Sequence, residues 1–378
     1  MPLAIFLDFL KLGCVSFGGP IAHLGYFHRR YVIERATLDE RDYAELLALC
    51  QFLPGPASSQ MSMAIGYRQH GVTGSLAAFA GFTLPSALLM LGAGLWLTGA
   101  PDNAWVAGAL SGLKLLAVAV VADAVLTLQA RCCPDTPRRV LALLTSIAVW
   151  LMPGTATQVA ALLGAALLGS LMGDAERAAG ATRPAVTRPH RWAWIAFALL
   201  WLAVWLVPGL AVFDTFYRVG SLVFGGGHVV LPLLGAEPLI RTGMDEATFI
   251  AGYSLAQAVP GPMFTLAGYL GSALNGSLLD GLVALTAIFL PGWLLLLAVL
   301  PLWSRLRGRP RLANAMAWVT AATVGLLLAA LYDPVFRSSV ADPADMAAVA
   351  ALWSLLKYTP LPVWAVVLVA GLGGALWG

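Results

Sequence analysis

The chain contains the same helix break twice, each time inside a long apolar segment. Residues 50–56 read CQFLPGP and residues 256–262 read AQAVPGP, so each Pro-Gly-Pro begins three residues after a Gln. Proline removes a backbone donor and clashes with the preceding helical turn, so a regular helix cannot run through either stretch. Any fold for this chain must therefore accommodate two equivalent interruptions.

The composition around these breaks excludes a soluble fold. Hydrophobic residues make up 60% of the chain and charged residues only 11%, whereas a soluble domain carries about 25% charged residues. The apolar runs are continuous rather than alternating, which indicates membrane-spanning helices and not a barrel. Most basic residues are Arg in short loops, where they report membrane orientation, so nucleic acid is not an expected partner. The four cysteines lack metal-ligand spacing, and we expect no metal and no cofactor.

The two breaks belong to a longer internal repeat. KLGCVSFGGP (11–20) matches RVGSLVFGGG (218–227), and FTLPSALLM (82–90) matches IFLPGWLLL (288–296), with the order of the matches kept. The sequence therefore predicts three parts: an N-terminal transporter repeat (1–173), a cytoplasmic linker with one connecting transmembrane helix (174–209) and a C-terminal repeat (210–378).

The positions of arginine predict that the two repeats are inverted relative to each other. Loop 99–104 has no basic residue and its counterpart 304–311 has four Arg, whereas loop 131–139 has three Arg and its counterpart 332–345 has one. Because Lys and Arg favour the cytoplasmic side, equivalent loops lie on opposite faces. We thus expect an all-α polytopic membrane protein: two inverted-topology repeats, with broken or re-entrant helices at the FGG and PGP motifs and one extra transmembrane helix between them. The N-terminus is predicted to be cytoplasmic.

The PGP breaks are candidate parts of a substrate-binding site. Broken helices of inverted repeats meet near the membrane midplane, where half-helix N-termini point at anionic substrate groups. The alternatives are a proline kink repaired by its neighbours and, for the glutamines, hydrogen bonding between helices. Two equivalent copies favour a binding site over a kink. The candidate residues here are Gln51, Gly55, Ser58, Ser59, Gln257, Gly261 and Thr265.

The glycine motifs and two aligned cations complete the candidate site. Glycine pairs permit either close approach to a ligand or close helix packing, and the pairs here are Gly18, Gly19, Gly225 and Gly226. Lys11 aligns with Arg218. A cation at the membrane centre costs on the order of 3 kcal/mol, which favours an anion-binding role over a side chain that reaches back to the interface. Asp123 has no counterpart in the other repeat, and structural pairing or an interfacial position is favoured for it over transfer of a coupling proton.

Together these residues resemble the chromate ion transporter family in its long, two-domain form. The resemblance rests on Lys11 with FGGP (17–20), LDE (38–40), PGP followed by GY (54–56 and 66–67), LP (84–85) and their echoes in the second half. The second half departs from the pattern, with FGGG for FGGP and Arg218 for Lys11. The resemblance implies a bacterial inner-membrane transporter that expels chromate and confers chromate resistance, with sulfate as an isosteric competitor.

The predicted function is secondary transport of tetrahedral oxyanions by alternating access between the halves, and not an enzymatic reaction. A dianion leaves the cytoplasm readily because an inside-negative potential contributes about 2.3 kcal/mol per charge per 100 mV. Sulfate or other anion uptake and a passive anion channel are open alternatives. An intramembrane lipid-phosphate enzyme is less favoured, because the repeated positions include no paired acid and base. The expected partners are chromate or sulfate, the lipid bilayer and, as open alternatives, coupling protons and a second copy of the chain.

Overall fold

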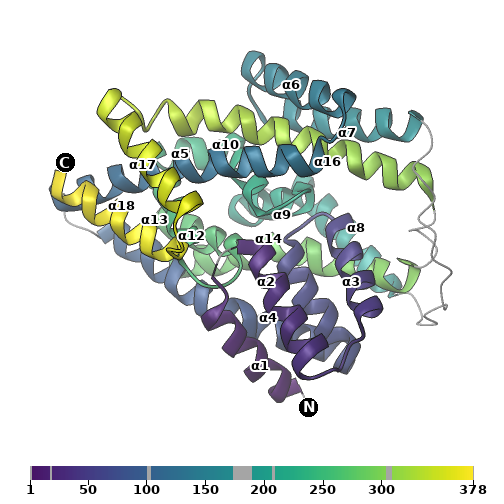
Figure 1. Ribbon diagram of the computed structural model, residues 1–378. Coiled ribbons are helices and arrows are strands. Elements are labelled where there is room, and N and C mark those ends of the chain that lie inside the picture. Colours follow the sequence, from purple (N-terminus) through teal and green to yellow (C-terminus); the bar gives the residue numbers. More distant parts are fainter. Residues whose placement is uncertain are drawn as a thin grey trace.

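The computed structural model describes residues 2–17, 19–99, 104–172, 190–206, 209–303 and 309–377. Within these ranges every regular element is a helix (Figure 1). This confirms the prediction of an all-helical chain. The helical stretches long and apolar enough to cross a membrane are Ala57–Leu97, Ala104–Cys132, Leu278–Leu302 and Pro310–Phe336. Gly18 and most of the predicted linker and of loops 99–104 and 304–311 lie outside the described residues.

The N-terminal repeat consists of two interrupted helix pairs followed by three further helices. The pair around the first FGG motif is α1 (Pro2–Val15) with α2 (Gly19–His28) and η1 (Arg29–Glu34). The pair around the first PGP motif is α3 (Glu40–Phe52) with α4 (Ala57–Gly99). The remaining helices are α5 (Ala104–Cys132), α6 (Thr136–Leu151) and α7 (Thr155–Leu171).

The C-terminal repeat follows the same order after the connecting helix α8 (Arg191–Leu206). Around the second FGG motif lie α9 (Ala211–Leu222), η2 (Gly227–Val229), α10 (Val230–Ala236) and α11 (Pro238–Gly243). Around the second PGP motif lie α12 (Glu246–Ala258), η3 (Met263–Thr265) and α13 (Leu266–Asn275). The repeat ends with α14 (Leu278–Val299), η4 (Leu300–Leu302), α16 (Pro310–Ala330), η5 (Leu331–Phe336), α17 (Pro343–Tyr358) and α18 (Val363–Trp377).

In both repeats a short helix separates the PGP break from a long apolar helix. In α4 the helix is interrupted at His70 and Gly71, where Gly71 has φ +59°. In the second copy α13 ends at Gly276, with φ +62°, before α14 begins. Both glycines have a positive φ, which glycine adopts more readily than other residues, and Gly276 is in the left-handed conformation common at the end of a helix. Each break is thus flanked by two short helices, and the long helix follows.

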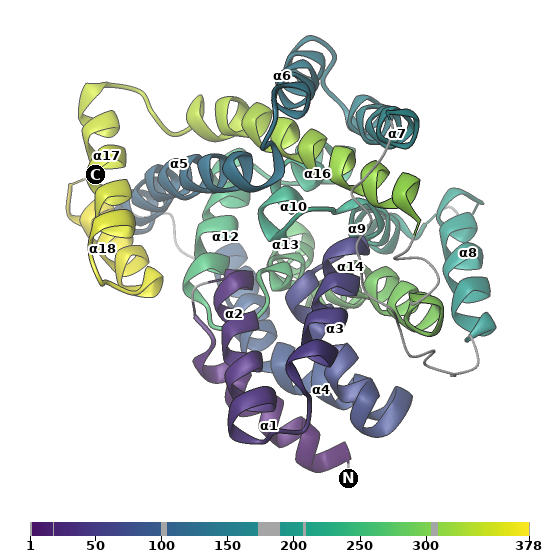
Figure 2. The same cartoon turned by 45° about the vertical axis from the view of Figure 1, so that its right-hand side comes forward.

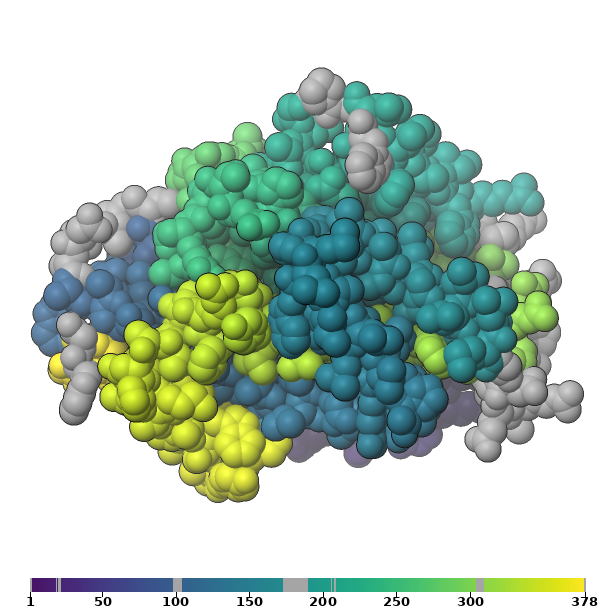
Figure 3. All heavy atoms as spheres, turned by 90° about the horizontal axis from the view of Figure 1, so that it is seen from above, coloured from purple at the N-terminus to yellow at the C-terminus, as the bar shows by residue number. Residues whose placement is uncertain are grey.

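The two repeats are interlocked, because the last two helices of each repeat pack against a helix of the other repeat. α5 of the N-terminal repeat packs against α17 and α18, while α16 of the C-terminal repeat packs against α6 and α7 (Figure 2). Small residues permit the close approach: a Cβ on Gly112 would overlap the carbonyl oxygen of Ala370, and one on Gly169 would overlap Ala315. Seen from above, C-terminal segments (yellow) and N-terminal segments (blue) share one face of the molecule (Figure 3).

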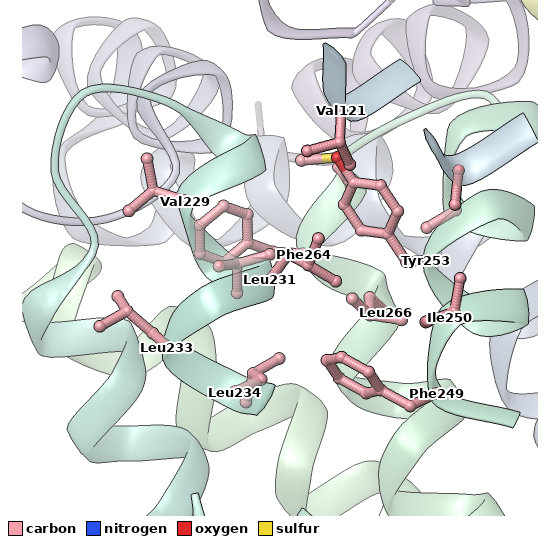
Figure 4. Packing of buried hydrophobic residues seen from close by; sticks show 14 of the residues in the cluster. Val121, Val229, Leu231, Leu233, Leu234, Phe249, Ile250, Tyr253, Phe264 and Leu266 are labelled. Atoms are coloured by element: carbon pink, nitrogen blue, oxygen red, sulfur yellow. The ribbon is translucent and has the colours of Figure 1, made fainter. Parts of the chain in front are cut away.

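The largest cluster of buried apolar side chains surrounds the breaks of the C-terminal repeat. It combines residues of α5, α10, α12 and α13 with η2 and η3. Phe264 and Leu266, which lie two and four residues after the second PGP motif, point toward Leu231 of α10 and Phe249 of α12 (Figure 4). Packing of this kind holds the interrupted backbone in one conformation.

Candidate functional site

Each PGP motif ends one helix and starts another through a glycine with a positive φ. Gly55 has φ +118° and Gly261 has φ +109°. The helix before each break is anchored at its far end by an aspartate cap, because Asp39 accepts from the Asp42 amide and Asp245 from the Thr248 amide. The sequence thus fixes both ends of the helix that leads into each break.

Contacts between the two arms show that each PGP break turns the chain back on itself. Arg68, late in the first part of α4, has its Nη2 3.5 Å from Oδ1 of Asp42 at the start of α3. In the second copy the Tyr269 hydroxyl of α13 donates to the carbonyl oxygen of Thr248, near the start of α12, at 3.0 Å. We call these units the PGP hairpins, residues 40–69 and 246–275.

The segments on either side of each FGG motif are likewise joined by a contact between them. In the first copy Asp8 of α1 accepts a hydrogen bond of 2.6 Å from Nη2 of Arg30, which lies beyond α2. In the second copy Arg218 of α9 pairs with Glu237, which follows α10. We call these units the FGG hairpins, residues 2–34 and 211–243.

The tips of the hairpins are joined across the two repeats by a reciprocal pair of backbone hydrogen bonds. The Gly55 amide donates to the carbonyl oxygen of Val223 at 2.7 Å, and the Gly261 amide donates to the carbonyl oxygen of Ser16 at 2.9 Å. Ser16 and Val223 each directly precede the Phe of an FGG motif. The PGP tip of each repeat is therefore bonded to the FGG tip of the other, and all four breaks meet.

A cavity of about 640 Å³ lies against these tips. Its lining comes from both repeats and includes glycines and glutamines of the breaks, one face of α5 and the junction between α17 and α18. The lining residues are Gly19, Leu24, Cys50, Gln51, Leu53, Gly55, Ala57, Val120, Asp123, Ala124, Thr127, Leu128, Arg131, Cys132, Gly225, Gly226, Gly227, His228, Gln257, Thr320, Leu356 and Val363.

One continuous face of α5 forms a wall of the cavity. Its lining residues run from Val120 to Cys132 at spacings of three and four, as expected for a single helix face. At 1.5 Å per residue these positions span about 18 Å. The polar members of the face are Asp123, Thr127 and Arg131. The cavity therefore reaches from the hairpin tips to the end of α5.

The charges of the lining are few and lie on α5. Arg131 supplies a cation near the end of the helix, and Asp123 forms an ion pair of 2.9 Å with Lys357 of α17. His228 has its Nδ1 2.7 Å from the Tyr253 hydroxyl. Near the hairpin tips the wall is formed by neutral groups, including the amides of Gln51 and Gln257.

Two helix N-termini lie at the cavity wall. Gly19 begins α2 and Ala57 begins α4, and both residues line the cavity. The first amides of a helix lack intrahelical acceptors, and the helix dipole makes this end attractive to an anion. With the two glutamine amides and the Arg131 guanidinium, the wall offers neutral donors and one positive charge to a small oxyanion.

The structure gathers six of the thirteen candidate residues around this cavity, namely Gly19, Gln51, Gly55, Gly225, Gly226 and Gln257. Gly261, Ser58, Ser59 and Thr265 are not among the lining residues, and the three hydroxyl residues are buried. Lys11 is exposed on α1, and Arg218 pairs with Glu237 and with Asp214. Gly18 lies outside the described residues.

Sequence reasoning left the α5 wall out of the candidate site. Asp123, Thr127 and Arg131 recur at a spacing of four, which is one helix face, so this signal was present in the sequence. The expected structural pairing of Asp123 is confirmed. Its partner Lys357 lies 234 residues away on a helix of the other repeat, and no local pattern connects the two positions.

Comparison with known proteins identifies the family to which the chain belongs. The model of the family described as Chromate transporter matches residues 3–174 and 210–375. The chain is 28% identical over 367 residues to the chromate transport protein of Cupriavidus metallidurans, covering 93% of this chain and 87% of the relative. It is 27% identical over 386 residues to the probable chromate transport protein of Synechococcus elongatus, covering 98% of this chain and 94% of the relative.

A further relative, an uncharacterized transporter of Methanocaldococcus jannaschii, is 26% identical and covers 86% of this chain and 83% of its own length. No solved structure matches the chain. The family model matches most of the sequence, and its two matched stretches contain both sets of hairpins. The chain therefore belongs to the chromate transporter family and is a multi-pass membrane protein.

Proposed function

We propose that this protein is a secondary transporter that expels chromate and related tetrahedral dianions from the bacterial cytoplasm by alternating access between two inverted halves. The observation that carries the proposal is a cavity lined by break residues of both repeats. Gln51 and Gly55 face it from the N-terminal repeat, and Gln257 and Gly225 from the C-terminal repeat. A relative movement of the repeats would change this cavity directly.

The chemistry of the cavity wall suits a small oxyanion. Neutral amide donors and helix N-termini stabilise negative charge without requiring a buried cation. Chromate and sulfate share charge and tetrahedral shape, so this wall alone would bind both. The family membership and the names of the relatives make chromate the first substrate to test.

The direction of transport follows from the predicted orientation. Arg131 and Cys132 lie at the end of α5 and line the cavity. They also begin loop 131–139, which the distribution of arginine predicts to be cytoplasmic. The cavity would then be open to the cytoplasm. A dianion bound there leaves the cell down an inside-negative potential.

Transport is tested by flux of labelled chromate and sulfate into inverted membrane vesicles containing the protein. Saturable uptake, and exchange of labelled for unlabelled anion without any gradient, are expected from a carrier. Flux that neither saturates nor exchanges would indicate a channel. If neither anion moves above the level of vesicles that lack the protein, the proposed function is wrong.

Two glutamine substitutions test whether anion transport passes through this cavity. Gln51→Leu and Gln257→Leu each remove a wall amide and should reduce flux at least tenfold, since one lost charge-assisted hydrogen bond is worth about 1.5–3 kcal/mol. Gln129→Leu is the matched control, because Gln129 lies on α5 but is not part of the cavity lining. An equal loss of flux in all three variants would show that the cavity amides have no specific role in transport.

A further inference from the structure

The cavity that would bind an anion also has a carboxylate in its wall. Asp123 lines the cavity from α5, and its Oδ1 lies 2.9 Å from Nζ of Lys357 on α17. Leu356 and Val363, on either side of Lys357, line the same cavity. The ion pair is thus located at the cavity rim, where it joins one repeat to the other.

The charges of the wall explain why this carboxylate must be neutralised. Among the described lining residues the ionisable side chains are those of Arg131, Asp123, His228 and two cysteines. An unpaired carboxylate would repel a dianion throughout the cavity. Paired with Lys357, Asp123 contributes little net field and leaves Arg131 as the net positive charge.

The pair is also easy to break. The side chains are 44% exposed for Lys357 and 32% exposed for Asp123. Ion pairs that are exposed to this degree add little stability. An oxyanion with two negative charges presents Lys357 with a stronger electrostatic partner than a single carboxylate does.

We propose that Lys357 is an anion-binding residue, that Asp123 is its resident counter-ion in the empty cavity, and that an incoming oxyanion dianion displaces this carboxylate. The inference deepens the proposed transport function and rests on it. Arg131 lies two helical turns from Asp123 on the same face of α5, about 12 Å along the helix. A dianion that enters from the end of α5 therefore meets Arg131 first and Lys357 next.

Displacement of Asp123 links binding to movement of the repeats. Asp123 belongs to the N-terminal repeat and Lys357 to the C-terminal repeat, so the empty cavity is bridged by their ion pair. When the anion binds Lys357, the ion pair between the repeats is broken. Binding thereby changes the contacts between the two halves, which any ligand-driven change of conformation requires.

The test compares two substitutions that break the same ion pair. Labelled sulfate and chromate are titrated onto purified, full-length protein, and anion exchange is measured after reconstitution. Asp123→Asn removes the competitor and should bind the dianion about threefold or more tightly. Lys357→Gln removes the binding group and should bind it at least tenfold more weakly, with Lys357→Arg retaining most of the affinity. The double variant should bind as weakly as Lys357→Gln.

A purely structural ion pair gives a different pattern, because both single substitutions would then weaken binding together. That outcome, in protein that remains monodisperse, would overturn the inference while exchange by the unaltered protein upholds the proposed function. If the unaltered protein neither binds nor exchanges either anion, the proposed function and the inference both fail. Arg337→Gln is the matched control: it breaks the exposed pair with Asp333, outside the cavity lining, and should leave affinity unchanged.

Discussion

The two FGG hairpins are closed by ion pairs at equivalent places but with opposite polarity. In the N-terminal hairpin the acid is on the first arm, where Asp8 pairs with Arg30 of the second arm. In the C-terminal hairpin the base is on the first arm, where Arg218 pairs with Glu237 of the second arm. Arg30 and Glu237 are 207 positions apart, which is also the offset between the two glycine motifs. The same position of the repeat is therefore occupied by a basic residue in one copy and by an acidic residue in the other.

This reversal indicates that each hairpin is closed by a pair of opposite charges, and that either arm can carry the positive one. The surroundings differ accordingly. Asp8 also accepts from the Tyr31 hydroxyl and pairs with Arg35, so the N-terminal pair has an excess of donors. Arg218 is instead shared between Glu237 and Asp214, so the C-terminal pair has an excess of carboxylates.

The largest expected effect is on stability when one partner of the C-terminal pair is removed. Glu237→Ala leaves Arg218, whose side chain is only 17% exposed, without its most buried partner. Loss of one member of a buried pair costs about 3–5 kcal/mol. Thermal unfolding of the purified protein in detergent should therefore occur at a much lower temperature.

A double variant shows whether this cost comes from the charge left behind. Arg218→Met with Glu237→Met removes both charges and should recover much of the lost stability. Glu34→Ala is the control, because Glu34 pairs with Arg29 and Arg30 at the exposed end of the other hairpin, and its loss should lower the unfolding temperature far less. Equal losses for Glu237→Ala and Glu34→Ala would contradict a buried pair.

The N-terminal pair should be less sensitive. Asp8→Asn removes the charge that Arg30 and Arg35 share, but these guanidinium groups are 31% and 40% exposed and water can solvate them. The remaining amide can still accept from Tyr31. We expect a loss of about 2 kcal/mol, which is the value of hydrogen bonds to a charged group. The same unfolding measurement checks it, and a loss larger than that of Glu237→Ala would reverse the ranking of the two hairpins.

Substitutions at the two PGP tips should lower the stability by a smaller amount, and the two tips can be compared with each other. Gly55→Ala and Gly261→Ala both place a side chain at a positive φ, which costs about 1–2 kcal/mol. Gly261→Ala should cost more, since its Cβ would lie 2.8 Å from the Ser86 Oγ, whereas that of Gly55 would lie 3.1 Å from Nε2 of Gln60. Unfolding temperatures of the two variants decide it, and a larger loss at Gly55 would show that the tips are not packed as described.

The repeat, the breaks and the apolar helices could be predicted because each leaves a local pattern: Pro-Gly-Pro, a paired glycine motif or a long apolar run. The hairpin pairs could not. An alignment of the repeats places Lys11 beside Arg218 and hides the fact that Arg218 corresponds in function to Asp8, three residues away. Lys357 could not be placed beside Asp123 either, because that contact depends on the exchange of closing helices between the repeats.

The smallest expected effect concerns a hydroxyl that reaches the C-terminal pair from the other repeat. Thr155, at the start of α7, has its Oγ1 3.4 Å from Oε1 of Glu237, and Thr37 has its Oγ1 3.4 Å from the carbonyl oxygen of Tyr31 beside the N-terminal pair. Both hydrogen bonds are long and therefore weak. The Thr155 hydroxyl also lies 3.4 Å from the carbonyl oxygen of Ala236, so it has two acceptors, one of them a buried carboxylate. Thr155→Val should therefore lower the free energy of unfolding by about 0.5–1 kcal/mol, and Thr37→Val should lower it by less, because its acceptor is a neutral carbonyl. A difference of the opposite sign in paired unfolding measurements would mean that the N-terminal repeat does not stabilise the C-terminal pair through Thr155.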